Sequence, residues 1–220
     1  METKIIIKTL LRESLLDEDY PESFNMDKFK SLTTFKDRVN YCSEHLKRIS
    51  SGTSRIVYKI DDEKVLKLAR NKKGLAQNEV EVDYSKEYVI ESILAKVFDY
   101  HEDYLWVEME LARPVTEKIF KQVNGYSFGL YSLAINNYYY GSLKPNNRNV
   151  RHIDGLEQAI QDLWEDEFAY DIFQYLGNFN VPVGDLMKLS SYGLVKRNGQ
   201  DTIVLIDYGL DHDTLEKYYS

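Results

Sequence analysis

Three ionisable side chains stand in sequence patterns that could carry chemistry. Lys67 follows apolar residues in a strand-like run, so its side chain can point to one face of the strand while its neighbours point to the other. Asp185 lies within Gly-Asp-Leu, and Asp207 precedes Tyr-Gly at the end of another apolar run. Each pattern has a simpler interpretation, because a strand lysine is often solvated at a sheet edge and an aspartate next to glycine often forms a turn.

The first half of the chain is expected to position Lys67 within a hairpin. Two strand-like runs are joined by the turn Asp61-Asp62-Glu63, and a loop of small residues precedes them. A helix is expected after Gly74, and a strand pair follows it, with Pro114 closing the block. The expected elements are strands over 55–60 and 64–69, a helix over 74–93, and strands over 95–100 and 104–111.

The second half is expected to be mainly helical before the two aspartates. Helices are predicted over 128–140 and 156–176, and a polar, locally basic loop over 141–151 separates them. The last part, from 181 onward, has two short strands with loops, joined by a turn at Asn198-Gly199. Both aspartates are therefore expected on loops beside short strands.

Two further helices are expected before the hairpin. Apolar residues recur near helical spacing over 5–15, and the acidic, proline-containing stretch over 17–27 is interpreted as a linker. A second helix is predicted from Thr34, which can cap its N-terminus. Cys42 lies on the apolar face of that helix and is interpreted as a small core residue rather than a catalytic thiol.

The overall composition excludes several kinds of site. The net charge of −8 argues against nucleic-acid binding across the whole surface. Cys42 is the only cysteine, so one chain can form neither a disulfide nor a four-cysteine zinc site, and the four histidines lack metal-ligand spacing. No apolar run is long enough to span a membrane, and the N-terminus does not resemble a signal peptide, so a cytoplasmic setting is expected.

The order of these parts resembles that of a protein kinase: loop and hairpin, lysine strand, helix with glutamate, strand pair, helices, and two aspartate loops. Val65-Leu66-Lys67 resembles the strand with the nucleotide-binding lysine. At the places of the glycine-rich loop the chain keeps Gly52 and Val57, while two other glycines are replaced. The resemblance implies an α+β, bilobal, protein-kinase-like fold with an antiparallel N-lobe sheet and a truncated, mostly helical C-lobe. The implied parts are an N-terminal helix and linker over 1–32, the N-lobe over 33–113, and the reduced C-lobe over 114–220.

The resemblance assigns nucleotide binding to the N-lobe. Lys67 would bind the α- and β-phosphates of ATP, and Glu79 in the following helix would pair with this lysine. Glu81 is the competing choice, because glutamates two residues apart face different sides of a helix and only one can pair. The implied nucleotide-binding residues are Gly52, Val57, Lys67, Met109, Glu110 and Ala112, the last two through their backbone carbonyl and N–H.

The aspartates would carry phosphoryl transfer. Gly184-Asp185-Leu186 resembles the catalytic loop in the form found in aminoglycoside-phosphotransferase-like kinases, so Asp185 would orient or deprotonate a hydroxyl acceptor. Asp207 would hold Mg²⁺ against the β- and γ-phosphates. The family has an asparagine after the catalytic aspartate as a second metal ligand. Here Ser190 stands at that spacing and Ser191 at the best local match, and a hydroxyl is a weaker ligand for Mg²⁺.

Two functions stay open at this point. Lys67, Glu79, Asp185 and Asp207 support an ATP- and Mg²⁺-dependent phosphotransferase acting on a hydroxyl. The replaced glycines, the serine and the 11 residues after Gly209, too few for a peptide-substrate platform, favour a pseudokinase that binds nucleotide or serves as an interaction module. The resemblance extends to compact kinase-like proteins of tailed bacteriophages, which implies the host cytoplasm or the virion. The N-terminal helix would then be able to dock a protein partner.

Overall fold

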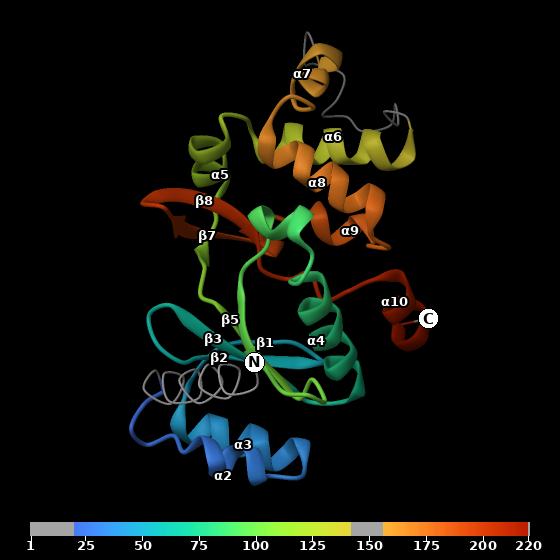
Figure 1. Cartoon of the computed structure of the whole chain (residues 1–220). Helices are drawn as coiled ribbons and strands as arrows, with labels where there is room; N and C mark the ends of the chain where they lie inside the picture. The colour runs from blue at the N-terminus through green and yellow to red at the C-terminus, as the bar shows by residue number, and fades with distance from the viewer. Residues whose placement is uncertain (1–19, 142–155, 220) are drawn as a thin grey trace, which may run out of the picture. The chain divides into compact units, whose positions relative to one another are not determined.

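The chain forms two antiparallel sheets and a set of helices, which Figure 1 shows in chain order. This computed structural model describes residues 20–141 and 156–219. The described residues divide into two compact units: one runs up to Asn78 and includes Val97–Leu111, and the other consists of Glu79–Lys96 and the residues from Ala112 onward. The predicted α+β class, with an antiparallel N-terminal sheet and a mainly helical C-terminal part, is confirmed. The predicted helix over 5–15 and most of the predicted basic loop lie outside the described residues.

The first unit is built on a five-stranded antiparallel sheet in the order β1-β2-β3-β5-β4. The predicted hairpin is confirmed, and Asp61 fixes its turn, because its Oδ1 accepts hydrogen bonds from the N–H groups of Glu63 at 2.6 Å and Lys64 at 2.7 Å. Strand β1 corrects the expectation of a loop before the hairpin; all of its side chains are exposed, so its sequence carries no apolar alternation. The strands are β1 (Lys47–Ser51), β2 (Arg55–Lys59), β3 (Lys64–Ala69), β4 (Val97–Tyr100) and β5 (Trp106–Glu110).

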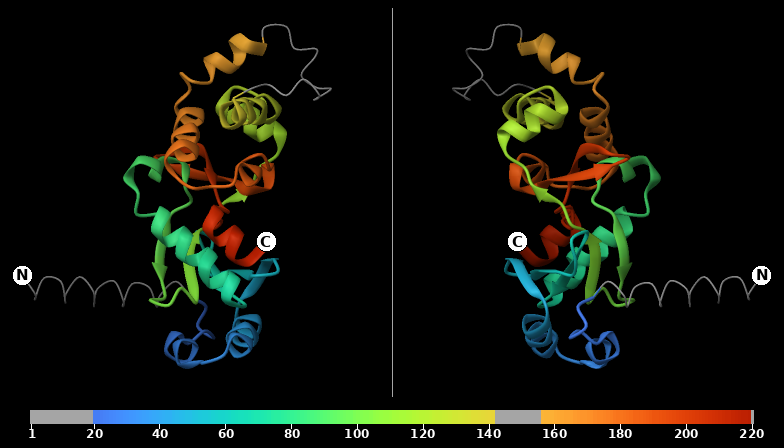
Figure 2. Two further views of the ribbon diagram at one scale, coloured as in Figure 1. Left: turned by 90° about the vertical axis from the view of Figure 1, so that its right-hand side faces the viewer. Right: turned by 90° about the vertical axis from the view of Figure 1, so that its left-hand side faces the viewer.

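Two helices, α2 (Met26–Ser31) and α3 (Phe35–His45), lie on one side of this sheet in both views of Figure 2. The predicted second helix is confirmed as α3, with Thr34 as its N-cap; the Thr34 Oγ1 accepts a hydrogen bond from the Asp37 N–H at 3.1 Å. Cys42, on the inner face of this helix, is fully buried, as predicted, and burial raises the pKa of its thiol to about 12.

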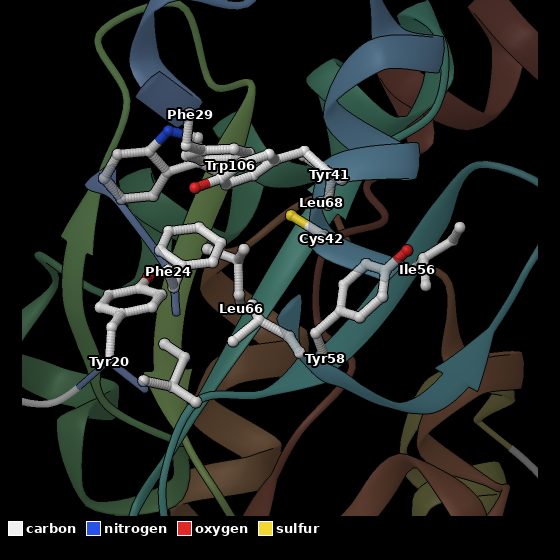
Figure 3. Close-up of a cluster of buried hydrophobic side chains, with 12 residues drawn as sticks. Tyr20, Phe24, Phe29, Tyr41, Cys42, Ile56, Tyr58, Leu66, Leu68 and Trp106 are labelled. Atoms are coloured by element: carbon white, nitrogen blue, oxygen red, sulfur yellow. The ribbon is translucent and has the colours of Figure 1, made fainter. Parts of the chain in front are cut away.

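The stretch interpreted as a linker is in fact part of the core of the first unit. Tyr20 and Phe24 are buried, and their rings stack with centroids 4.5 Å apart (Figure 3). The Tyr20 hydroxyl also donates a hydrogen bond of 2.5 Å to Glu108 on β5. The acidic residues of this stretch gave it the composition of a loop, whereas its aromatic side chains anchor it to the sheet. The cluster comprises Tyr20, Phe24, Phe29, Tyr41, Cys42, Leu46, Ile56, Tyr58, Ile60, Leu66, Leu68 and Trp106.

Helix α4 (Lys72–Tyr84) is shorter than predicted and is followed by the 3₁₀ helix η1 (Tyr88–Ile93). The Ser85 hydroxyl donates a hydrogen bond of 2.7 Å to the Val82 carbonyl, which satisfies one of the carbonyls that a helix leaves open at its end. At its start the helix is pressed against the β1–β2 turn: a Cβ on Gly74 would lie 2.3 Å from the Ser54 carbonyl oxygen. Glycine is therefore required there for close packing.

The second unit surrounds a three-stranded antiparallel sheet with short helices. The predicted turn at Asn198-Gly199 is confirmed, with φ values of 52° and 81°, and so is the helix predicted over 128–140. The remaining elements are β6 (Arg113–Pro114), α5 (Glu117–Asn124), α6 (Phe128–Tyr140), α7 (Leu156–Asp162), α8 (Glu167–Asn178), α9 (Val183–Leu186), η2 (Leu189–Ser191), β7 (Tyr192–Arg197), β8 (Gln200–Leu205) and α10 (His212–Tyr219). Among the described residues, no helix is both long and apolar enough to cross a membrane.

Two predictions for the second unit are wrong. The single helix expected over 156–176 is broken into α7 and α8, because Asp166 caps a new helix by accepting a hydrogen bond from the Ala169 N–H at 2.9 Å. The segment 183–186, expected as a loop beside a short strand, forms the helical turn α9, which carries Asp185. The apolar pattern continues through both segments. The Asp166 cap sets the local structure in the first, and the helical turn over 183–186 sets it in the second.

Candidate functional site

Lys67 lies in the middle of the first sheet and is buried. Its strand, β3, pairs with β2 on one side and β5 on the other, where Lys67 faces Val57 and Val107. Leu66 and Leu68 belong to the core beneath α2 and α3, so strand alternation places Lys67 on the opposite face of the sheet. Only 6% of Lys67 is exposed, which rules out a solvated lysine on an edge strand.

The same sheet face carries the apolar residues that were predicted to contact nucleotide. Val57 stands next to Lys67 on β2, and Met109 on β5 pairs with Val65 on β3. Met109 is 1% exposed and Val57 is half-buried. Glu110 ends β5 with its side chain half-buried, so its predicted carbonyl contact would lie at the strand end.

The turn between β1 and β2, which contains Gly52, is held by side chains that follow β3. Arg70 Nη1 donates to the Gly52 carbonyl at 2.9 Å, Asn71 Nδ2 donates to the Thr53 carbonyl at 3.0 Å, and the Arg70 N–H donates to the Ser54 carbonyl at 2.8 Å. A Cβ on Gly52 would come no closer than 3.7 Å to other heavy atoms, so packing alone does not require glycine there. This turn is thus fastened through its carbonyl groups.

The two glutamates of α4 lie in different environments. Glu81 is fully buried, between buried Val80 and Val82, whereas Glu79 is exposed. A buried carboxylate is stable only when it is paired or hydrogen-bonded. Burial therefore favours Glu81 over the predicted Glu79 as the carboxylate of a functional site.

Asp185 on α9 forms an ion pair with Lys188, with 2.6 Å between Oδ1 and Nζ. The pair is partly solvated, since the side chains of Lys188 and Asp185 are 62% and 33% exposed. The hydrogen bond and charge of Asp185 raise the pKa of Lys188, and the charge of Asp207 adds to this effect. Lys188 thus interacts electrostatically with both aspartates that were predicted for the site. The sequence analysis did not single out this lysine.

Backbone hydrogen bonds bring the segments of the two aspartates together. The Ser191 N–H donates to the Lys188 carbonyl at 3.0 Å, and the Ile206 N–H donates to the Ser191 carbonyl at 2.9 Å. Asp207 follows directly after Ile206 and is exposed. Of the two serines considered as ligands, Ser191 is buried and Ser190 is exposed.

The residues around Lys188 suit a small, hard cation such as Mg²⁺. Asp185 and Asp207 supply partly or fully exposed carboxylate oxygens on adjoining segments, and Mg²⁺ is commonly held by one or two carboxylates together with phosphate oxygens and water. Within the described ranges, no group of three or more His, Cys, Asp or Glu side chains is arranged to hold a metal. Phosphate oxygens would have to complete such a site.

A buried pair of hydrogen-bonded tyrosines contacts the segment that carries Asp185. The Tyr192 hydroxyl donates to the Leu186 carbonyl at 2.8 Å and hydrogen-bonds the Tyr131 hydroxyl at 2.7 Å. Burial raises the pKa of both phenols, so they stay neutral. Next to them, Gly193 lets Ala112 approach, because a Cβ on the glycine would lie 2.3 Å from the Ala112 Cβ. This packing sets the position of Ala112, the predicted adenine-binding residue.

No protein-family model and no curated protein matches the chain. Several solved structures do. Aminoglycoside 2'-phosphotransferase-IIIa in complex with GDP is 11% identical, with 84% of this chain and 70% of that chain covered and a TM-score of 0.37. APH(2")-IIa with streptomycin and ATP is 16% identical, with 81% and 72% covered and a TM-score of 0.33. ADP-bound aminoglycoside phosphotransferase APH(2'')-Ib is 16% identical, with 80% and 69% covered and a TM-score of 0.32. TM-scores this low leave the functional assignment to the chain's own residues.

Proposed function

We propose that the chain binds ATP with Mg²⁺ and transfers phosphate to a hydroxyl acceptor. The observation that carries this proposal is the burial of Lys67 on the central strand, beside Val57 and Met109 on one sheet face. A lysine is almost never buried unless an anion or carboxylate compensates its charge. A strand lysine among apolar residues is suited to bind nucleotide phosphate while the apolar side chains contact the base.

The roles of the other residues follow from their surroundings. Glu81, rather than Glu79, is the helix carboxylate of the site, because it is the buried one. Asp207 and Asp185 would hold Mg²⁺, whose charge would offset the negative charge of the phosphates. Asp185 would also accept the proton of the attacking hydroxyl on a carboxylate oxygen.

The hydrogen bond from Lys188 limits which Asp185 oxygen can accept that proton. Its ammonium already donates to Asp185 Oδ1, so an acceptor hydroxyl must use the other carboxylate oxygen or displace the lysine. Once displaced, the ammonium would remain close enough to bind phosphate oxygens. The proton of the acceptor would thus move to Asp185 while Lys188 keeps the local charge balanced.

A thermal-shift titration tests nucleotide binding directly. ATP present at 100 times its Kd stabilises the folded chain by about 2.7 kcal/mol, which raises the Tm by roughly 5–10 °C at this chain length. Lys67→Met should abolish the shift. The matched control is Lys196→Met, since Lys196 is an exposed strand lysine paired with Asp201 at 3.4 Å. A wild-type protein that shows no shift at millimolar ATP would contradict the proposal.

The alternative function is a nucleotide-binding module without transfer. Two observations favour it: the ion pair between Lys188 and Asp185, and a serine in place of the second metal ligand. This alternative predicts an ATP-induced shift that does not require Mg²⁺, together with no phosphate release. ATP turnover, measured as ADP release, that is lost in Asp185→Asn with the ATP shift retained would instead support the transferase.

A further inference from the structure

The end of helix η1 and the residues that follow it, 91–95, are fastened to the β7–β8 hairpin of the second unit. Arg197, at the end of β7, donates to three successive parts of this segment: its Nη1 to the Glu91 and Ser92 carbonyls at 3.2 and 2.9 Å, and its Nη2 to the Leu94 carbonyl at 2.6 Å. The Ala95 N–H then donates to the Leu205 carbonyl of β8 at 2.8 Å. The guanidinium is thus used as a clamp on backbone oxygens rather than as an ion-pair partner alone.

The last contact of this segment comes from Tyr208, which directly follows Asp207. Its hydroxyl donates to the Ala95 carbonyl at 2.9 Å, and its ring is buried. On the other side of Asp207, the Ile206 N–H is bound to the Ser191 carbonyl at 2.9 Å. Both neighbours of the exposed Asp207 are therefore held by hydrogen bonds, Ile206 through its backbone N–H and Tyr208 through its side-chain hydroxyl.

We propose that Tyr208 and Arg197 are positioning residues that hold Asp207 in the orientation needed to bind a divalent cation. This inference rests on the proposed function, in which Asp207 is a metal ligand. Tyr208 acts on the neighbouring peptide directly, and Arg197 acts by fixing the segment to which the Tyr208 hydroxyl is bound. The phenol hydroxyl therefore has a role that a phenylalanine at this position could not fill.

The physical reason lies in the ordering that metal binding requires. A carboxylate on a mobile loop loses conformational freedom when it binds a cation, whereas a carboxylate on a fixed backbone loses less. Removing the Tyr208 hydroxyl leaves the buried Ala95 carbonyl without this donor and loosens the peptide next to Asp207. A typical hydrogen bond contributes about 0.5–1.5 kcal/mol, so the affinity for the cation should fall by roughly two- to tenfold.

The test is calorimetric titration of Mn²⁺ into the full chain with a non-hydrolysable ATP analogue. Tyr208→Phe, which removes one oxygen, should weaken Mn²⁺ binding two- to tenfold. Arg197→Met should weaken it as well, and Arg197→Lys should restore part of the loss because it keeps a donor. Arg113→Met is the control: Arg113 is exposed and reaches the same hairpin through Asp201 at 3.4 Å, and its loss should leave the affinity unchanged.

The outcomes separate the two proposals. If wild type binds Mn²⁺ and Tyr208→Phe and Arg197→Met bind it equally well, Tyr208 and Arg197 are structural only and the inference is refuted, even if the Tm falls. If wild type binds no Mn²⁺, the proposed metal site itself fails. Hydrogen exchange at the amides of residues 206–208 gives a second readout, since Tyr208→Phe should speed exchange there without nucleotide; unchanged exchange would count against the clamp.

Discussion

Replacing Lys188 by methionine should strengthen divalent-cation binding. In the wild-type chain the ammonium lies 2.6 Å from Asp185 Oδ1 and also acts on Asp207, so a cation must compete with an internal positive charge. Methionine keeps an unbranched apolar stem and removes the ammonium with its charge and hydrogen-bond donors. The Asp185 carboxylate, released from this ammonium, can then bind Mn²⁺ or Mg²⁺.

The magnitude follows from the exposure of the pair. With the two side chains 62% and 33% exposed, the pair belongs among solvated ion pairs, which contribute about 0.2–1 kcal/mol. The Kd for Mn²⁺ should therefore fall by about 1.5- to fivefold, and the free energy of unfolding should change by less than about 1 kcal/mol. The pKa of Lys188 is raised, so the pair is complete below the ordinary lysine pKa of about 10.4. The difference between wild type and variant should thus be constant through neutral pH.

The assay is titration calorimetry of Mn²⁺ into the protein with a non-hydrolysable ATP analogue, at low and high ionic strength. The difference between wild type and Lys188→Met should shrink with added salt, because exposed charges are screened. Lys188→Arg should resemble wild type, and Lys196→Met, which removes an exposed lysine paired at 3.4 Å, should have no effect. Equal or weaker Mn²⁺ binding by Lys188→Met would refute the competition between lysine and metal.

Three further predictions concern residues of the first unit. Gly74→Ala should destabilise the chain by about 1–3 kcal/mol in urea unfolding, because the added Cβ would lie 2.3 Å from the Ser54 carbonyl oxygen. The matched control is Gly129→Ala, which should be neutral or stabilising, since the added Cβ would have no heavy atom nearer than 3.9 Å. Tyr20→Phe should cost about 1.5–3 kcal/mol, since a buried hydrogen bond to a carboxylate is lost, and a change below 0.5 kcal/mol would argue against that contact. Cys42 should resist thiol reagents in the folded chain, and labelling at the rate of a free thiol would show that it is not buried.

Several features of both units could be predicted because their signals are local. Asp61 ends a strand with a turn, Thr34 caps a helix, and Asn198-Gly199 suits a turn with positive φ at both residues. The missed features depend on contacts between distant residues. Tyr20 is anchored by a strand residue 88 positions away, and nothing in an acidic stretch of chain signals that partner.

The sequence alone could not choose between Glu79 and Glu81 either. Helical geometry establishes that the two face different sides, but only packing decides which side is buried. In the structure that side belongs to Glu81. Lys188 carries a signal that sequence inspection could have used: a lysine three residues after an aspartate lies on the same side of a helical turn. That signal has meaning only once residues 183–186 are known to be helical rather than extended.

Each unit holds its own candidate residues by fixed contacts. In the first unit the carbonyls of the β1–β2 turn are bound by Arg70 and Asn71, and in the second the neighbours of Asp207 are bound through the Ile206 N–H and the Tyr208 hydroxyl. Ligand binding costs less conformational entropy when the residues that contact the ligand are already held in place, and this applies equally to an enzyme and to a binding module. What separates these functions is Asp185, which can take a proton only from a group able to share its carboxylate with Lys188. The proposed transferase therefore needs either the second oxygen of this carboxylate for its acceptor or a phosphate that draws the lysine away, whereas a binding module can leave the ion pair intact.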